Sequence, residues 1–353
     1  MTGNKTTQGN FFEDFRLGQT IRHPTPRTIT DGDVTLYTAL YGSRFAVHSS
    51  RAFAAAIGLP AAPIDDWLVF HVVFGKTVSD ISLNAVANLG YADGRFGEPV
   101  YPGDTLSTVS DVIGLRESAK RDSGVVYVRS VGSNQRGETV LSYMRWVLVP
   151  KRDPANPAPT TAVPTFPDAV PADQLHVAAG LDLSSYDTVL AGSANLWDDF
   201  IVGERIDHAD GVTVEEAEHM LAARLYQNTA RAHFNEQAMK DGRFGRRLIY
   251  GGHIISMARA LSFNGLANAF RVAALNGGRH VTPAFAGNTI YAWSEILEKH
   301  ALPQRDDLGA LRIRTVATKD QPCAEFPDKT PEGKPHPAVV LDLDYTVLVP
   351  RRR

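Results

Sequence analysis

Two short segments near the start of one apolar stretch combine residue types that suit proton transfer beside a developing negative charge. The first reads Tyr226-Gln-Asn-Thr-Ala-Arg-Ala-His233, and the second reads Leu248-Ile-Tyr-Gly-Gly-His253. A neutral imidazole can take a proton from water near pH 7. A glycine at a helix start leaves a backbone N–H open to an oxygen that gains charge. The structural alternatives are a histidine that only anchors its segment and glycines that only allow close helix packing.

An internal repeat indicates which elements position these segments. Residues 12–48 align without a gap with residues 197–233, and ten of the 37 aligned pairs are identical, including His48 with His233. Two shorter matches follow, residues 99–106 with 283–290 and residues 147–150 with 347–350. We therefore interpret the chain as two copies of one unit of about 150 residues.

A proline-rich segment separates the two copies. Seven prolines fall among the 22 residues from Pro150 to Pro171, a composition that favours an extended, semi-rigid tether. The predicted division is an N-terminal unit at 1–150, a linker at 151–174 and a C-terminal unit at 175–353.

Each copy carries the same predicted elements. A helix is expected at residues 67–78 in the first copy and at 252–266 in the second, and both are apolar almost all round, so both should be buried. Strand-like runs close each copy, at 105–112, 125–131 and 139–149, and at 289–297, 311–318 and 339–349. One buried helix against an antiparallel sheet in each copy predicts an α+β fold.

Composition narrows the class of protein. The chain has 353 residues, of which 43% are hydrophobic, and no run of 18 apolar residues, so we expect no membrane-spanning helix. A net charge of -3 argues against a nucleic-acid partner. The single Cys323 leaves no cysteine-based metal site, and no metal, flavin or nicotinamide motif is visible. The first ten residues lack a secretory signal, so a cytoplasmic protein is expected.

The second copy resembles the MaoC-like, (R)-specific enoyl-CoA hydratase family. In that family an aspartate lies five residues before a histidine, and an Ile-Val-His-Gly stretch follows at the spacing that separates His233 from Gly251. The strand start at residues 99–106 is a further shared feature. The chain length and the Asn-Thr-Ala-Xaa-Xaa-His-Phe segment are similar to those of mesaconyl-CoA (2-methylfumaryl-CoA) hydratases. The resemblance implies a tandem (double) hotdog fold, in which antiparallel sheet wraps two long apolar helices.

The same resemblance implies a hydro-lyase that hydrates an α,β-unsaturated acyl-CoA reversibly, here mesaconyl-CoA to β-methylmalyl-CoA. Coenzyme A then enters only as part of the substrate, and no cofactor is expected. His233 takes the place of the family's catalytic histidine, and the N–H of Gly251 takes that of the donor to the thioester oxygen. Asn228 replaces the family's aspartate, and an amide can hold a water but cannot accept its proton.

The first copy departs further from the family pattern. His48 is kept, but Ser43 replaces the aspartate, and Asp65 and Asp66 fill the positions that Tyr250 and Gly251 hold in the second copy. We interpret this site as degenerate, with Asp65 or Asp66 as a candidate for the missing acid across the interface between copies.

A dicarboxylic acyl-CoA needs cations for its carboxylate and its phosphates. Arg231, two residues before His233, is the expected partner of the carboxylate, and Arg224 and Arg259 are alternatives. The predicted substrate-binding set also contains Tyr250, Gly252 and, for a CoA phosphate, Arg279.

Two other functions stay open at this point. Hotdog folds also host acyl-CoA thioesterases, which commonly use a carboxylate near the central helix, and Asp65 and Asp66 are candidates. The missing aspartate also leaves room for a non-catalytic acyl-CoA-binding module. Association of several chains into a homo-oligomer is a further open expectation.

Overall fold

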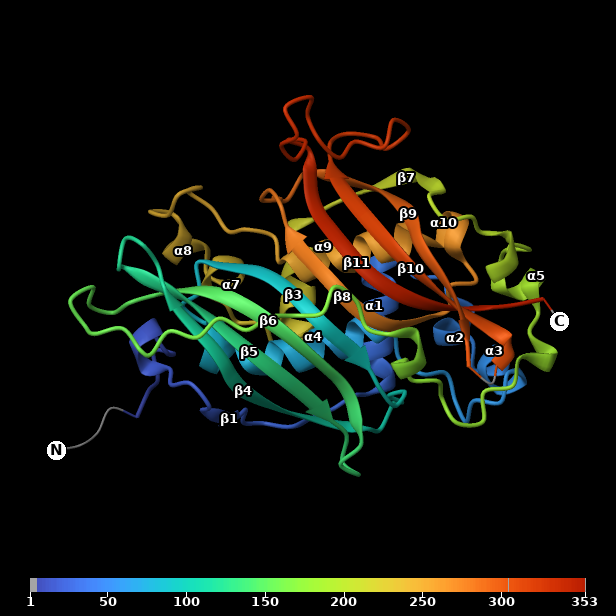
Figure 1. The fold of residues 1–353 in the computed structure, drawn as a ribbon, viewed down its shortest axis with the longest axis horizontal. Coiled ribbons are helices and arrows are strands. Elements are labelled where there is room, and N and C mark those ends of the chain that lie inside the picture. Colours follow the sequence, from blue (N-terminus) through green and yellow to red (C-terminus); the bar gives the residue numbers. More distant parts are fainter. Residues whose placement is uncertain (1–4, 304, 353) are drawn as a thin grey trace.

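The computed structural model describes residues 5–303 and 305–352. One continuous, wholly antiparallel sheet runs through this part of the chain, in the order β1-β4-β5-β6-β3-β8-β11-β10-β9-β7, with β2 beside β4 (Figure 1). The first copy supplies β1 (Thr20–Arg22), β2 (Arg27–Thr28), β3 (Ala87–Phe96), β4 (Thr105–Glu117), β5 (Ser123–Ser133) and β6 (Thr139–Pro150). The second supplies β7 (Arg205–Thr213), β8 (Arg271–His280), β9 (Thr289–Leu302), β10 (Arg305–Lys319) and β11 (Val339–Pro350).

Two central helices, α4 (Asp66–Thr77) and α9 (Gly251–Leu261), lie against one face of this sheet (Figure 1). Helix α4 packs on β4, β5 and β6, and α9 packs on β9, β10 and β11. The predicted second helix was too long, because α9 ends at Leu261, and the short α10 (Phe263–Leu266) that follows is kinked, with a φ of 106° at Gly265. The other α-helices of the described residues are α1 (Asp31–Tyr41), α2 (Ala46–Ser49), α3 (Arg51–Ala56), α5 (Thr188–Ala191), α6 (Glu216–Leu225), α7 (Arg231–Phe234) and α8 (Glu236–Met239).

Strands β3 and β8 join the two copies at the middle of the sheet. Tyr91 pairs with Gly278, and Gly94 pairs with Leu275. A Cβ on Gly94 would lie 2.6 Å from the Cβ of Leu275, so only glycine allows the strands to approach this closely here. The copies therefore share one sheet and one interface, while the boundaries 1–150, 151–174 and 175–353 stay a prediction.

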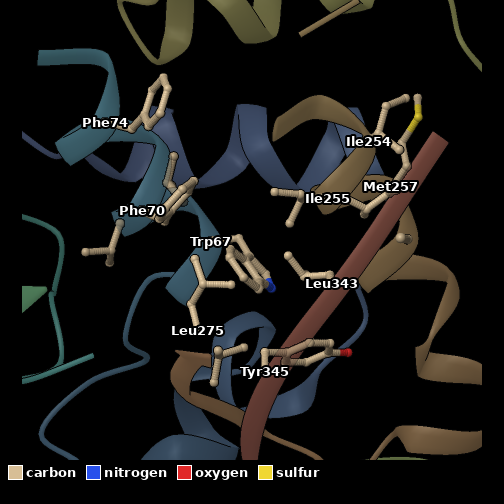
Figure 2. Packing of buried hydrophobic residues seen from close by; sticks show 14 of the residues in the cluster. Trp67, Phe70, Phe74, Ile254, Ile255, Met257, Leu275, Leu343 and Tyr345 are labelled. Atoms are coloured by element: carbon tan, nitrogen blue, oxygen red, sulfur yellow. The ribbon is translucent and has the colours of Figure 1, made fainter. Parts of the chain in front are cut away.

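The main core fills the space between the two central helices and the sheet. Figure 2 shows Trp67 and Phe70 of α4, Ile255 of α9 and Tyr345 of β11 within it, all of them almost completely buried. The ring centroids of Trp67 and Tyr345 lie 6.0 Å apart. Large apolar side chains from both copies thus build one core, which fixes the two helices relative to each other.

The proline-rich segment lies on the opposite face of the sheet. Phe166 stacks on Trp146 with 5.1 Å between ring centroids, and Ala162 forms a backbone bridge with Leu115. Neighbouring residues of a strand point to opposite faces, and Arg145, next to Trp146, packs on Phe74 of α4. The segment therefore packs around Trp146 on the face away from the central helices.

Candidate active site

A cavity of about 270 Å³ lies between the two copies at the start of α9. The second copy contributes its catalytic candidates, and the first copy contributes side chains of α4, β3 and β6. The lining includes His233, Asn228, Gly251, Tyr250 and His280 from the second copy, and Phe74, Ser82, Tyr91 and Arg145 from the first. Val86 and Phe244 also line it and are 59% and 39% exposed, so the mouth lies between them. The structure thus gathers the three predicted catalytic residues in one cavity.

His233 sits on α7 with one ring nitrogen held and the other free. Its Nδ1 lies 3.0 Å from the carbonyl oxygen of Leu248. A carbonyl can only accept, so Nδ1 carries the proton and Nε2 has a lone pair. Burial lowers the pKa of His233 below its usual 6.5, which keeps the ring neutral near pH 7. This is the protonation state that a general base needs.

His48 of the first copy repeats this geometry. Its Nδ1 lies 3.0 Å from the carbonyl oxygen of Pro63, the residue that aligns with Leu248. The anchoring hydrogen bond is therefore a property of the fold in both copies. What differs between the copies is what surrounds the free Nε2.

The start of α9 presents backbone N–H groups to the cavity. Gly251 is the first residue of the helix, and no described residue accepts a hydrogen bond from its N–H. A Cβ at Gly251 would lie 2.2 Å from Cε1 of His280, so the ring of His280 covers the glycine and requires it. The arrangement suits an oxygen that becomes negative during a reaction.

Neutral histidines and tyrosines hold this helix start in place. The N–H of Tyr250 donates to Nε2 of His219 over 2.9 Å, and burial lowers the pKa of His219 to about 2. Burial likewise lowers the pKa of His280 to about 4, and its Nε2 lies 3.1 Å from the Tyr91 hydroxyl. Tyr250 is buried, with its hydroxyl 3.4 Å from Nδ1 of His71. The sequence did not indicate His280 or Tyr91, because they come from β8 and β3, two strands that it also missed.

Asn228 lies buried beside His233 in place of the family's aspartate. Its Oδ1 accepts a hydrogen bond of 3.3 Å from the N–H of Ala230. Its Nδ2 has no partner among the described residues and is left to face the cavity. An amide donor in this position can hold a water or a substrate oxygen without adding charge.

The first-copy site is closed. Its remaining space of about 10 Å³, beside Ser43, His48 and Asp65, has room for at most one water. Trp67 stands at the position of Gly252 and packs on Tyr345 in the apolar core (Figure 2). The sequence-based interpretation of this site as degenerate therefore agrees with its geometry.

Asp65 and Asp66 do not reach the cavity of His233. Oδ1 of Asp65 caps α4 by accepting from the N–H of Trp67 over 2.9 Å. Oδ2 of Asp66 accepts from the N–H of Val272 over 2.8 Å, and its Oδ1 lies 3.6 Å from Nε of Arg271. Both carboxylates are thus occupied in holding α4 to its surroundings, which corrects the expectation that one of them supplies the missing acid.

The predicted cations also lie elsewhere. Arg231 is exposed on α7 and donates to Oδ1 of Asn84 over 2.7 Å, and it does not line the cavity. Arg279 is 54% exposed and pairs with Asp342 at 3.2 Å. Gly252 is buried behind the lining, where a Cβ would meet the rings of Tyr250 and His71. The expectation that Arg231 meets a buried carboxylate is therefore corrected by the outward direction of its side chain.

The cation that does line the cavity is Arg145 of β6. It is completely buried, and its guanidinium lies over the ring of Phe74 at 4.2 Å. No carboxylate lies among the described residues of the lining. The only signal in the sequence was strand alternation, which places Arg145 on the same face as Tyr143 and Val147.

The fold of this chain is also found in solved structures. A Mycobacterium tuberculosis protein described as having a double hotdog fold shares 24% identity, with 97% of this chain and 98% of that chain covered and a TM-score of 0.76. A crystal structure of a MaoC domain protein dehydratase from Chloroflexus aurantiacus shares 67% identity over 99% of this chain and 100% of that chain, with a TM-score of 0.97. The chain is therefore a double hotdog protein, as predicted.

Sequence comparisons define the family more narrowly. The family model for mesaconyl-CoA hydratase matches residues 2–325, and the chain belongs to this family. The β-methylmalyl-CoA dehydratase of Chloroflexus aurantiacus is 68% identical, with 99% of each chain covered. The mesaconyl-CoA hydratase of Cereibacter sphaeroides is 58% identical, with 98% of this chain and 100% of that protein covered. The predicted family is confirmed.

Among the described residues, no helix is long and apolar enough to cross a membrane.

Proposed function

We propose that this protein hydrates mesaconyl-CoA (2-methylfumaryl-CoA) to β-methylmalyl-CoA reversibly, in the cavity around His233. The observation that carries the proposal is the free Nε2 of a neutral His233 in one cavity with the unpaired N–H of Gly251. Relatives at 68% and 58% identity carry the names of the two directions of this reaction, which supports the choice of substrate.

The site residues supply each step of the addition. A water held by Nδ2 of Asn228 gives a proton to Nε2 of His233 while its oxygen bonds to C3 of the acyl group. The electron pair of the C2=C3 bond moves toward the thioester, whose oxygen becomes an enolate oxygen and accepts from the N–H of Gly251. One such donor contributes about 10²–10³-fold in rate. The imidazolium of His233 then returns its proton to C2, so one residue acts as base and acid.

The lack of a lining carboxylate among the described residues favours this reaction over the thioesterase alternative. Thioesterases of this fold commonly use a carboxylate near the central helix, and the candidates Asp65 and Asp66 are held outside the cavity. No cofactor takes part in the proposed reaction, because coenzyme A enters with the substrate. We place the reaction in the cytoplasm and leave homo-oligomerisation as an expectation.

Two arginines beside the mouth are proposed to hold the CoA phosphates. Arg246 lies over the ring of Phe285 at 3.9 Å, and Arg243 lies over that of Phe244 at 5.1 Å. Both are exposed, and neither pairs with a described carboxylate. They replace Arg279 as the better-placed candidates, since Phe244 itself lines the cavity.

The test is an assay of the purified protein with mesaconyl-CoA and, separately, with β-methylmalyl-CoA. Each is expected to be converted into the other with loss or gain of one water, followed by enoyl-thioester absorbance and mass spectrometry. A thiol reagent in parallel reactions detects any free coenzyme A. Release of coenzyme A without hydration would show that the protein is a thioesterase instead. Binding of the thioester without conversion would show that it is an acyl-CoA-binding module.

A further inference from the structure

Arg145 is a buried cation whose charge the described protein residues do not balance. Its Nη2 donates to the hydroxyls of Thr77 and Ser82, at 2.8 and 3.2 Å. Its Nε and Nη1 are buried without a hydrogen-bond partner, and it forms no ion pair with any described carboxylate. Burying a charged group without an opposite charge is costly, so a fold retains one only where something else repays the cost.

Arg145 belongs to the wall of the cavity of the proposed reaction. Arg145 lines the space that also contains His233 and Gly251, and its neighbours Ser82 and Phe74 line it too. In the sheet, Arg145 pairs with Tyr91. The Tyr91 hydroxyl contacts His280, whose ring covers Gly251. A ligand held at Gly251 and His233 would therefore occupy the cavity whose wall includes Arg145.

The position of Arg145 differs between the two copies, as the positions of the catalytic residues do. The closing match of the repeat, residues 147–150 with 347–350, aligns Arg145 with Tyr345. Tyr345 packs on Trp67 in the apolar core, and the space beside His48 in that copy has only about 10 Å³ left. At this position of the repeat, an arginine therefore stands only in the wall of the open cavity that contains His233 and Gly251. A requirement of the fold alone would apply to both copies.

From this geometry we propose that Arg145 binds the carboxylate of the acyl group and selects dicarboxylic enoyl-CoA substrates whose acyl main chain has four carbons. The inference rests on the proposed function and specifies its substrate class. In 2-methylfumaryl-CoA the carboxylate is bonded to C3, the carbon that water attacks. A guanidinium beside this carboxylate orients the alkene. It also offsets the negative charge of the carboxylate, which would otherwise repel the lone pair of the attacking water. The uncharged amide of Asn228 is compatible with the same substrate, because the carboxylate of an aspartate would repel the carboxylate of the acyl group.

The experiment compares acyl groups that differ only in the carboxylate. Tiglyl-CoA carries a methyl group where 2-methylfumaryl-CoA carries the carboxylate, and butyryl-CoA and succinyl-CoA form a similar pair that cannot be hydrated. Arg145→Met keeps an apolar chain against Phe74, and Arg145→Lys keeps a charge. Two matched controls are Arg231→Met, at the exposed arginine, and Arg259→Met, at a buried arginine outside the cavity lining.

We expect Arg145→Met to lower kcat/KM for 2-methylfumaryl-CoA by about 10²-fold or more relative to tiglyl-CoA. The preference for binding succinyl-CoA over butyryl-CoA, measured by calorimetry, should disappear with it. Arg145→Lys should retain part of that preference, and both control variants should retain all of it. The melting temperature of ligand-free Arg145→Met should rise, because an unbalanced buried charge has been removed.

Unchanged acyl-CoA preferences in Arg145→Met would overturn the assignment, and a lowered melting temperature with unchanged preferences would make Arg145 a structural residue. If Arg145→Met does not fold, the proposal is tested by the binding of succinyl-CoA and butyryl-CoA to Arg145→Lys. An unaltered preference for succinyl-CoA in that variant rejects the proposal. These results are distinct from failure of the proposed function. That failure would appear in the wild-type protein, as no conversion of 2-methylfumaryl-CoA.

Discussion

The duplicated histidines allow catalysis to be separated from structure within one molecule. His233 and His48 each donate from Nδ1 to a main-chain carbonyl over 3.0 Å, to Leu248 and Pro63. Replacing either one by asparagine keeps an N–H donor near the position of Nδ1 and removes Nε2. The structural cost of His233→Asn and His48→Asn should therefore be similar. Only His233→Asn removes a base from an open cavity.

The expected magnitudes differ enough to decide the question. An altered hydrogen bond of this kind changes stability by about 0.5–1.5 kcal/mol, and this should apply to both variants. General base catalysis contributes about 10²–10⁴-fold, so His233→Asn should lower kcat by at least about 10²-fold. That loss corresponds to roughly 2.7 kcal/mol of barrier. His48→Asn should leave kcat within about twofold, since its surroundings are closed to substrate.

The assay is steady-state hydration of mesaconyl-CoA, with thermal unfolding of each variant as the measure of folding. Comparable losses of kcat in the two variants, with both still folded, would refute the assignment of catalysis to the second copy. A loss of less than tenfold in His233→Asn would refute the role of His233 as the base. Either result would make the tyrosines of the cavity the next candidates for the base.

Two further outcomes follow from the charges of the site. Asn228→Asp places a carboxylate beside that of the substrate, so kcat/KM should fall more for 2-methylfumaryl-CoA than for tiglyl-CoA; equal changes for both thioesters would contradict this account. The second outcome concerns pH. The lowered pKa of His233 predicts that kcat/KM stays level from pH 8 to about 6.5 and declines only below it, and a decline that begins above pH 7 would disagree. The unfolded chain protonates histidines below about pH 6.5, whereas His219, His253 and His280 remain neutral in the fold, with pKa values near 2, 3 and 4. The free energy of unfolding should therefore fall as pH drops from 6.5 towards 4, by up to about 1.4 kcal/mol per pH unit for each such histidine, and melting temperatures across this range measure it.

The repeat made most of the architecture predictable from the sequence. Pairs such as His48 and His233, together with the apolar runs that became α4 and α9, indicated two similar units with one buried helix each. The central strands β3 and β8 were missed, because glycine and asparagine interrupt the residue pattern typical of strands. Their glycines serve close packing instead, since a Cβ at Gly90 would lie 2.4 Å from the ring of Trp146. Such contacts belong to the tertiary structure and leave no local signal.

The catalytic part of the site was predicted better than its binding part. His233, Asn228 and Gly251 lie on one local pattern, so their spacing was enough to bring them together. Arg231 was chosen for its nearness in sequence, but α7 directs it towards solvent and Asn84. Arg145 lies far from His233 in the chain and reaches the same cavity only because β3 and β8 join the two copies side by side in one sheet. Partners across such an interface cannot be identified from spacing along the chain.

The asymmetry between the copies explains why a repeated unit keeps both halves. The second copy has the base and the free helix start, whereas the first copy has neither an open cavity beside His48 nor a glycine at the start of α4. What the first copy offers is the wall of the other site, through Phe74, Tyr91 and Arg145. Because one wall no longer has to serve a second active site, a cation can lie there permanently. A symmetric pair of hotdog units would have to place that cation in both sites or in neither.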